Sequence, residues 1–111
     1  MAYTINGEAV ELPAAEDIGG VTFVPVGKVT ELLGGYVTWN NADKIAELEL
    51  NGKKVNVQAD NDDVTAGVET HTLPSRPSMG GGSLWVPLAL FSDVFGCKVS
   101  DDGVGGVSIS V

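Results

Sequence analysis

The chain has 111 residues, of which 15 are acidic and 6 are basic, and its formal charge is −9. This charge argues against nucleic acids and anionic membrane surfaces as partners, because both are bound through clustered Lys and Arg. A hydrophobic content of 43% indicates a chain that folds, and the length suits a single domain, residues 1–111, with one modest core. No apolar stretch reaches the roughly 20 residues of a membrane helix and no leader peptide is recognised, so we expect no membrane insertion.

Two Asn-Gly pairs predict tight hairpin turns early in the chain and near its middle. Asn6-Gly7 and Asn51-Gly52 each lie between strand-like runs. Such a turn needs positive φ at both central residues, which Asn and Gly adopt most easily. Other segments are predicted from composition and alternation: polar turns at 40–43 and 60–63, strands at 68–74 and 107–111, and a loop rich in Pro, Ser and Gly at 74–83.

The sequence repeats itself, and the repeat is its most informative feature. Residues 23–26 (Phe-Val-Pro-Val) recur as residues 85–88 (Trp-Val-Pro-Leu), and the match continues without a gap. Proline and glycine recurring in register constrain the backbone at equivalent points. We therefore predict two pseudo-repeats, at about 1–58 and 64–111.

Each repeat is predicted to be a strand, a short helix and a second strand. Apolar residues at helical spacing follow each proline, and Gly34 and Gly96 are expected to end the helices, which gives helices at about 26–33 and 88–95. Helices this short need a sheet to pack against. The predicted fold class is therefore α+β, with a twisted antiparallel sheet packed around two short helices. The apolar stripes comprise Val26, Val29, Leu32 and Leu33 in the first helix, and Leu88, Phe91, Val94 and Phe95 in the second.

The ordered motifs resemble those of a known family. They are Asn51-Gly52-Lys53-Lys54-Val55, Val24-Pro25-Val26, Leu33-Gly34 and Val37-Thr38-Trp39. Together they resemble the copper amine oxidase N-terminal domain family, in which an Asn-Gly-Lys hairpin, a Val-Pro helix start, a Leu-Gly helix end and a Val-x-Trp strand recur. The second half departs from the pattern: Ala66-Gly67 replaces Asn-Gly, Cys97 follows the helix-ending glycine, and Asp101 stands where the tryptophan would be.

The resemblance implies a peripheral domain without chemistry of its own. In amine oxidases this domain is a stalk distant from the copper, and similar repeats occur in exported and cell-surface proteins of Gram-positive bacteria. It thus implies an extracellular or cell-surface location, no catalytic residue and no cofactor. The implied partner is the rest of a larger parent protein, with a cell-wall polymer or another protein as a further possibility.

The residues themselves offer little for metal or catalytic chemistry. A copper site needs several imidazoles, or two with a thiolate, whereas the chain has one histidine, His71, and one cysteine, Cys97. We expect no copper, and no triad around His71, because no serine lies in a nucleophile motif. Lys98 could activate Cys97, although a buried thiol is the simpler interpretation. Calcium at the acidic turns 60–63 and 101–102 is a further hypothesis, against the ordinary interpretation that they are solvated turns.

Carbohydrate binding is the alternative function, and Trp39 is its candidate contact. Trp39 ends a predicted strand beside a turn and aligns with Asp101, so packing does not fix its residue type. Trp85 aligns with Phe23 and is expected in the core. The sequence thus predicts a non-catalytic spacer or interaction domain, or alternatively a cell-wall or carbohydrate-binding module that uses Trp39.

Overall fold

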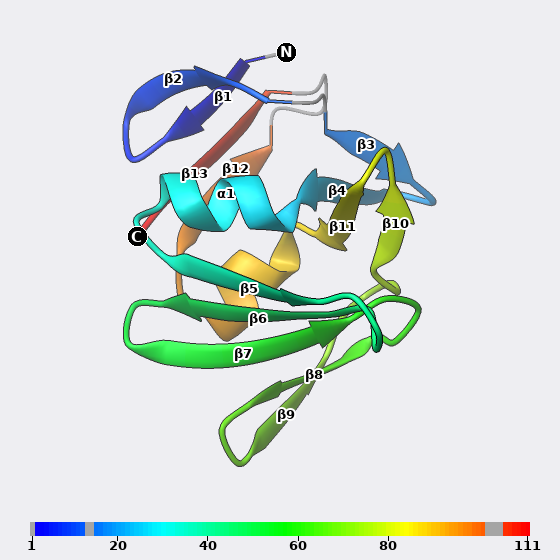
Figure 1. Ribbon diagram of the computed structural model, residues 1–111. Coiled ribbons are helices and arrows are strands. Elements are labelled where there is room, and N and C mark those ends of the chain that lie inside the picture. Colours follow the sequence, from blue (N-terminus) through cyan, green and yellow to red (C-terminus); the bar gives the residue numbers. More distant parts are fainter. Residues whose placement is uncertain (1, 13–14, 102–105) are drawn as a thin grey trace.

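The described residues, 2–12, 15–101 and 106–111, form three β-sheets and two short helices in the computed structural model (Figure 1). Sheet A has the strand order β12-β13-β1-β2, sheet B the order β10-β11-β4-β3, and sheet C the order β5-β6-β7-β8-β9. The helices are α1 (Val26–Leu32) and η1 (Leu90–Val94). The strands are β1 (Ala2–Ile5), β2 (Glu8–Glu11), β3 (Glu16–Ile18), β4 (Val21–Pro25), β5 (Tyr36–Asn40), β6 (Ile45–Leu50), β7 (Lys53–Gln58), β8 (Asp63–Ala66), β9 (Glu69–Thr72), β10 (Ser78–Gly80), β11 (Ser83–Pro87), β12 (Lys98–Asp101) and β13 (Val107–Ser110).

The α+β class agrees with these elements, but the prediction of one antiparallel sheet is wrong. The strands separate into three sheets, and β1 pairs with β13 in parallel, with Tyr3 opposite Val107. These two strands come from opposite ends of the chain. Local sequence patterns specify which residues form strands, whereas the pairing of such distant strands is set by the burial of their shared apolar face.

The predicted Asn-Gly hairpins are confirmed. Asn6 and Asn51 have φ angles of 50° and 55°, and the turns join β1 to β2 and β6 to β7. The loop predicted at 74–83 is partly wrong, because it contains β10, which pairs with β11. Its composition favours turns, and the hydrogen bonds to a neighbouring strand override that preference.

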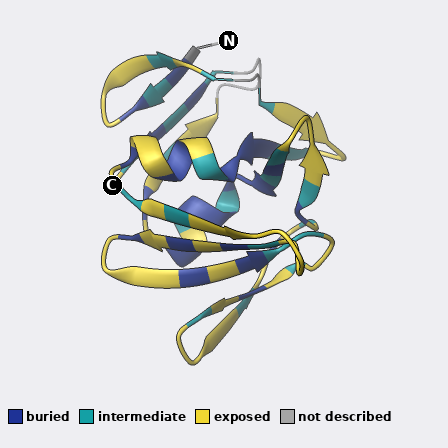
Figure 2. Cartoon of the chain, viewed as in Figure 1, coloured by how far each residue is buried: buried dark blue, intermediate teal, exposed yellow. Residues whose placement is uncertain are grey.

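The hydrophobic core surrounds the two helices, which lie between sheet C on one side and sheets A and B on the other (Figures 1 and 2). The outer faces of the sheets and the β8–β9 hairpin are largely exposed (Figure 2). The largest fully buried side chains come from every layer of the fold: Tyr3, Phe23, Phe91, Leu48, Leu90 and Ile109.

Helix α1 ends as its sequence predicts, but its buried face differs from the prediction. Gly34, with φ of 91°, donates its N–H to Glu31 O, and the next glycine donates to Thr30 O, which together satisfy the last carbonyls of the helix. Leu32 is 44% exposed, whereas Thr30 is fully buried. At 100° per residue Thr30 lies closer than Leu32 to the middle of the face formed by Val26, Val29 and Leu33.

The second helix is also shorter and of a different type than predicted. The predicted α-helix at 88–95 is a single π-helical turn, Leu90–Val94, in which Phe95 N–H bonds to Leu90 O. Leu88 is still held to β4, because its N–H donates to Thr22 O at 2.8 Å, and this delays the start of the helix. The wider turn buries both Phe91 and Phe95, whose ring centroids lie 6.0 Å apart.

The two Val-Pro segments lie side by side in sheet B. Strands β4 and β11 are antiparallel, with Val24 opposite Val86, Phe23 opposite Pro87 and Pro25 opposite Trp85. Strand β3 flanks β4, and β10 flanks β11, so each of the two central strands of sheet B pairs on its outer side with the strand that precedes it in the chain.

Candidate functional site

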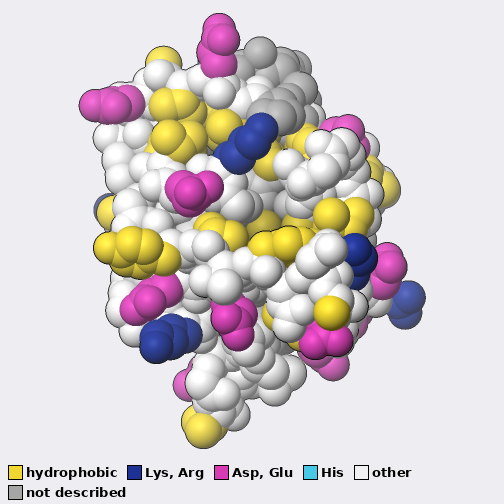
Figure 3. Space-filling view, in the orientation of Figure 1, with side chains coloured by type: hydrophobic (Ala, Val, Ile, Leu, Met, Phe, Trp, Pro, Cys, Tyr) yellow, Lys and Arg dark blue, Asp and Glu magenta, His cyan; other side chains and the backbone are white. Residues whose placement is uncertain are grey.

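Trp39 lies in an open groove between α1, β5 and the turn that joins β10 to β11. The groove has a volume of about 200 Å³. Trp39 is 38% exposed, and Met79, which also lines the groove, is 44% exposed. Lys28 and Glu31 of α1 complete the lining on one side. Figure 3 shows a band of hydrophobic side chains across this face of the molecule, over the region of α1 and β5.

The register of sheet C explains why Trp39 points into this groove. In an antiparallel pair, directly opposed residues share a face of the sheet. Val37 is opposite Leu48 and Trp39 is opposite Ala46. Both partners are buried, so Val37 and Trp39 face the same side as the core. Because β5 is an edge strand, the large indole ring reaches past the edge of the core and stays partly exposed.

The indole is held by a polar contact with the β5–β6 turn. Trp39 Nε1 donates to Asn41 Oδ1 at 3.4 Å, and Lys44 Nζ donates to the same oxygen at 3.2 Å. The predicted ligand contact at Trp39 therefore lies in a groove with apolar walls and a polar rim. Binding of a ligand there stays a prediction.

Trp85 is less buried than predicted from its alignment with Phe23. Phe23 is 2% exposed, whereas Trp85 is half-buried. Trp85 packs over β10, where its Nε1 donates to Gly80 O at 3.0 Å and a side chain at Gly80 would meet the ring at 3.3 Å. The ring therefore covers the backbone of β10 instead of entering the core.

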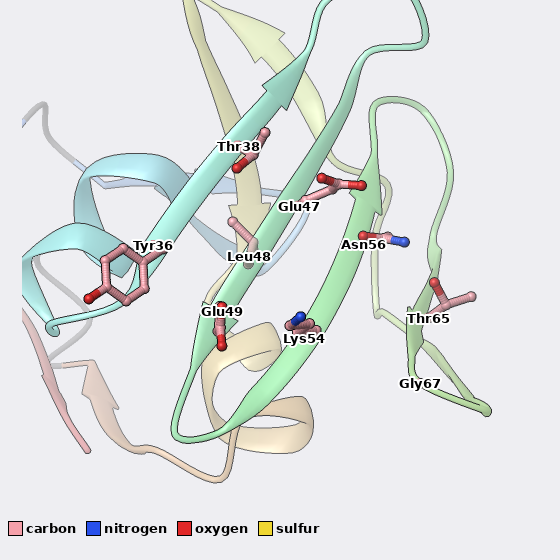
Figure 4. A pocket seen from close by; sticks show the side chains of 9 residues that line it. All are labelled: Tyr36, Thr38, Glu47, Leu48, Glu49, Lys54, Asn56, Thr65 and Gly67. Carbon is pink, nitrogen blue, oxygen red and sulfur yellow. The ribbon is translucent and has the colours of Figure 1, made fainter.

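A second, more polar depression covers the outer face of sheet C and was not predicted from the sequence (Figure 4). Its volume is about 460 Å³. Tyr36, which is 73% exposed, lies at one end, and Glu47 and Glu49 of β6 and Lys54 and Asn56 of β7 line it. The alternation of polar and apolar residues in β6 and β7 could have indicated this face, but alternation does not reveal curvature.

The acidic turns do not assemble a metal site among the residues that the structure describes. No group of three or more His, Cys, Asp or Glu side chains there could hold a metal ion. In the 60–63 turn, Asn61 Oδ1 accepts from Asp63 N–H at 3.0 Å, and Asp63 accepts from the Thr72 hydroxyl. Asp101 accepts a hydrogen bond from the Thr22 hydroxyl, and position 102 lies outside the described residues. These side chains serve the turns and sheet edges, so the calcium hypothesis gains no support.

His71 and Cys97 lie in different parts of the fold and do not form a shared site. His71 is on β9 of sheet C, where its Nε2 lies 3.3 Å from Glu69 Oε2. Cys97 lies between η1 and β12 and is 6% exposed. Burial raises the pKa of the Cys97 thiol above its ordinary value, which is opposite to the activation by Lys98 considered from the sequence. The chain's one imidazole and one thiol therefore do not fit a copper site.

No helix in the described part of the chain is both long and apolar enough to cross a membrane.

Comparison with known proteins identifies the family. The profile of the copper amine oxidase N-terminal domain matches residues 4–109. A curated protein of Brevibacillus choshinensis, named a protease inhibitor, is 29% identical over 107 residues, which make up 94% of this chain and 33% of that relative. The chain thus spans about a third of the length of this relative. Because the family profile covers nearly the whole sequence, the chain belongs to the copper amine oxidase N-terminal domain family.

Proposed function

We propose that this chain is a non-catalytic interaction or spacer domain of a larger, exported or cell-surface protein of a Gram-positive bacterium. The observation that carries the proposal is the family match over residues 4–109, in a family whose N-terminal domain is non-catalytic. The relative supports it, because that protein is about three times as long and is named an inhibitor, a class that acts by binding a protein.

The proposal includes a construction from two related halves, at about 1–58 and 64–111. The pairing of Val24 with Val86 across β4 and β11 supports it, because residues that match in the sequence repeat stand opposite each other. The equivalent segments that follow are also similar in kind, since each is a short helix ended by a glycine with positive φ, Gly34 or Gly96.

The size and location of the native protein test this role. Antibodies raised against residues 1–111 are used to probe medium, cell-wall and cytoplasmic fractions of the source bacterium. We expect a species far heavier than 11.5 kDa in the medium or the wall fraction. A cytoplasmic species of the mass of this chain alone would refute the proposal.

A carbohydrate-binding role is the second candidate, and the partly exposed indole of Trp39 favours it. A sugar ring can stack on an exposed aromatic face, and the groove beside Trp39 is open. The test is tryptophan fluorescence titrated with peptidoglycan fragments and soluble polysaccharides, in the wild type and in Trp85→Phe, in which Trp39 is the sole tryptophan. A saturable change that is lost in Trp39→Phe supports this role, whereas an unchanged spectrum with every ligand excludes it for those ligands.

A further inference from the structure

We propose that β5 is a docking edge, to which an extended peptide segment of a partner protein adds as a further strand of sheet C. The partner segment alternates apolar residues, which enter the Trp39 groove, with basic residues, which lie on the outer face of the sheet. This inference rests on the proposed role as an interaction domain and names the surface and the chemistry of the partner.

The first observation is the pattern of backbone hydrogen bonds in sheet C. Ala59 N–H bonds to Lys44 O at 3.0 Å, one step beyond the pair in which Ile45 is opposite Gln58. Hydrogen-bonded pairs alternate along an antiparallel ladder, so the even-numbered residues of β6 bond to β7 and the odd-numbered ones bond to β5. Ile45, Glu47 and Glu49 are opposite Asn40, Thr38 and Tyr36, respectively.

It follows that the backbone groups of Val37 and Trp39 point away from β6, toward the open edge of the sheet. Within the described part of the chain, no strand pairs with β5 on that side. Among the described residues, Val37 and Trp39 also take part in none of the backbone hydrogen bonds of turns and loops. An added strand meets such an edge with alternating donors and acceptors at matching spacing, which is how peptides bind in strand addition.

The second observation is that the sequence of β5 lacks the charged residues and prolines that protect sheet edges, while helix α1 packs beside this strand. Its sequence, Tyr-Val-Thr-Trp-Asn, carries no charge and no proline, and it is rich in residues that favour strands. Every other edge strand among the described residues carries a charge or has only three residues: β2 (Glu8, Glu11), β3 (Glu16, Asp17), β9 (Glu69), β10 (Ser78–Gly80) and β12 (Lys98, Asp101).

The third observation is that the groove runs along this same edge. Val37 and Trp39 form one wall, and Met79 and Leu84 contribute apolar surface from the β10–β11 hairpin. A strand added to β5 would place every second side chain on the face that Val37 and Trp39 occupy. Those side chains would enter the groove, which favours apolar residues at these positions.

The charge of the chain selects the partner. The outer face beside β5 carries Glu47, directly opposite Thr38, and Glu49, which is opposite Lys54 of β7. Long basic side chains of an added strand can extend over Thr38 toward these carboxylates. A second copy of this chain would instead bring another charge of −9, so a partner segment with basic residues is favoured over self-association.

The test uses a ten-residue peptide of alternating Val and Lys with blocked ends, titrated into the ¹⁵N-labelled protein. We expect amide shifts centred on β5 and slowed hydrogen exchange at Val37 and Trp39. The same peptide N-methylated at alternate amides keeps its side chains but loses main-chain donors, and it should bind at least about tenfold more weakly. Equal binding of the two peptides, or shifts confined to other elements, would overturn the proposal.

Two variants separate the edge from general charge attraction. Val37→Pro removes a donor at the open edge, and Thr70→Pro is the matched control. Leu73 N–H bonds to Asp62 O, and the same alternation then directs the Thr70 N–H outward from β9, at the opposite edge of sheet C. We expect about a tenfold loss of affinity in Val37→Pro and less than about a twofold change in Thr70→Pro.

A third variant and a mass measurement complete the design. Trp39→Lys keeps the backbone intact and places a charge in the groove, so it should weaken binding even if Val37→Pro does not fold. Sedimentation of the free protein should give the mass of one chain. A dimer that dissociates in Trp39→Lys would mean that the β5 edge binds a second copy of this chain, and the proposal of a partner peptide would be wrong. If the native protein is large and wall-bound but the domain fails to bind the peptide, that result would refute the docking role of β5 and leave the proposed role as an interaction domain unaffected.

Discussion

Truncation of Phe91 is the sharpest test of the core. Phe91 is fully buried in η1, beneath sheet C, and its ring stacks on Phe95 at a centroid distance of 6.0 Å. Replacing such a buried aromatic ring by alanine costs about 3–5 kcal/mol, because apolar contacts are lost and the surrounding structure only partly fills the cavity. We therefore expect Phe91→Ala to lower the free energy of unfolding by this amount.

The cost is large compared with the stability of a domain of this size. Domains are stable by only about 5–15 kcal/mol, and each kcal/mol shifts the melting temperature by roughly 4 °C at about this length. The expected fall is therefore on the order of 12–20 °C. Urea denaturation followed by circular dichroism measures the free energy, and thermal scans measure the melting temperature.

A matched control comes from the other helix. Leu32 occupies the position in α1 that corresponds to buried Val94, yet it is 44% exposed. Leu32→Ala should therefore cost less than about 1 kcal/mol. If Phe91→Ala has the melting temperature of the wild type, or if both variants lose the same free energy of unfolding, the assignment of η1 to the core is refuted.

Three further predictions concern single groups. The buried Thr30 hydroxyl has no hydrogen-bond partner among the described residues, so Thr30→Val should be neutral or stabilise the fold by about 1 kcal/mol in urea denaturation; a loss above about 1 kcal/mol would show that the hydroxyl is hydrogen-bonded. A side chain at Gly35 would lie 2.4 Å from Glu49 O, so Gly35→Ala should cost at least about 1–3 kcal/mol, and a wild-type melting temperature would contradict this contact. Burial raises the pKa of Tyr3 from 10.0 to about 12. The unfolded state therefore ionises first, and stability present below pH 10 should fall by about 2–3 kcal/mol as the pH rises to 12. Tyr3→Phe should show less of this loss, and identical alkaline unfolding of the two proteins would disprove the assignment.

Local signals in the sequence determined many of the elements. Asn6-Gly7 and Asn51-Gly52 fixed two hairpins, because few residues tolerate positive φ at consecutive positions. Pro25 and Gly34 bracketed α1 for similar backbone reasons. Each of these signals depends only on residues close in the chain, so the sequence alone was sufficient to predict them.

The candidate site was only partly accessible to the same reasoning. The sequence singled out Trp39 because it ends a strand and aligns with an acidic residue. Its groove, however, combines α1, β5 and the β10–β11 turn, and β10 was not predicted at all. The polar face that includes Tyr36 was also missed, since its shape depends on how β5, β6 and β7 curve together.

Tertiary structure alone decided the division into three sheets, the parallel pairing of β1 with β13 and the π turn of η1. The apolar stripe of the second helix is compatible with either an α or a π turn. The choice depends on the hydrogen bond that keeps Leu88 on β4 and on the space available to Phe91 and Phe95. The sequence thus determined which residues favour strands, turns and helix ends, because those preferences are local. The packing of distant segments determined which strands pair and which strands, β5 among them, lie at the edges of the sheets.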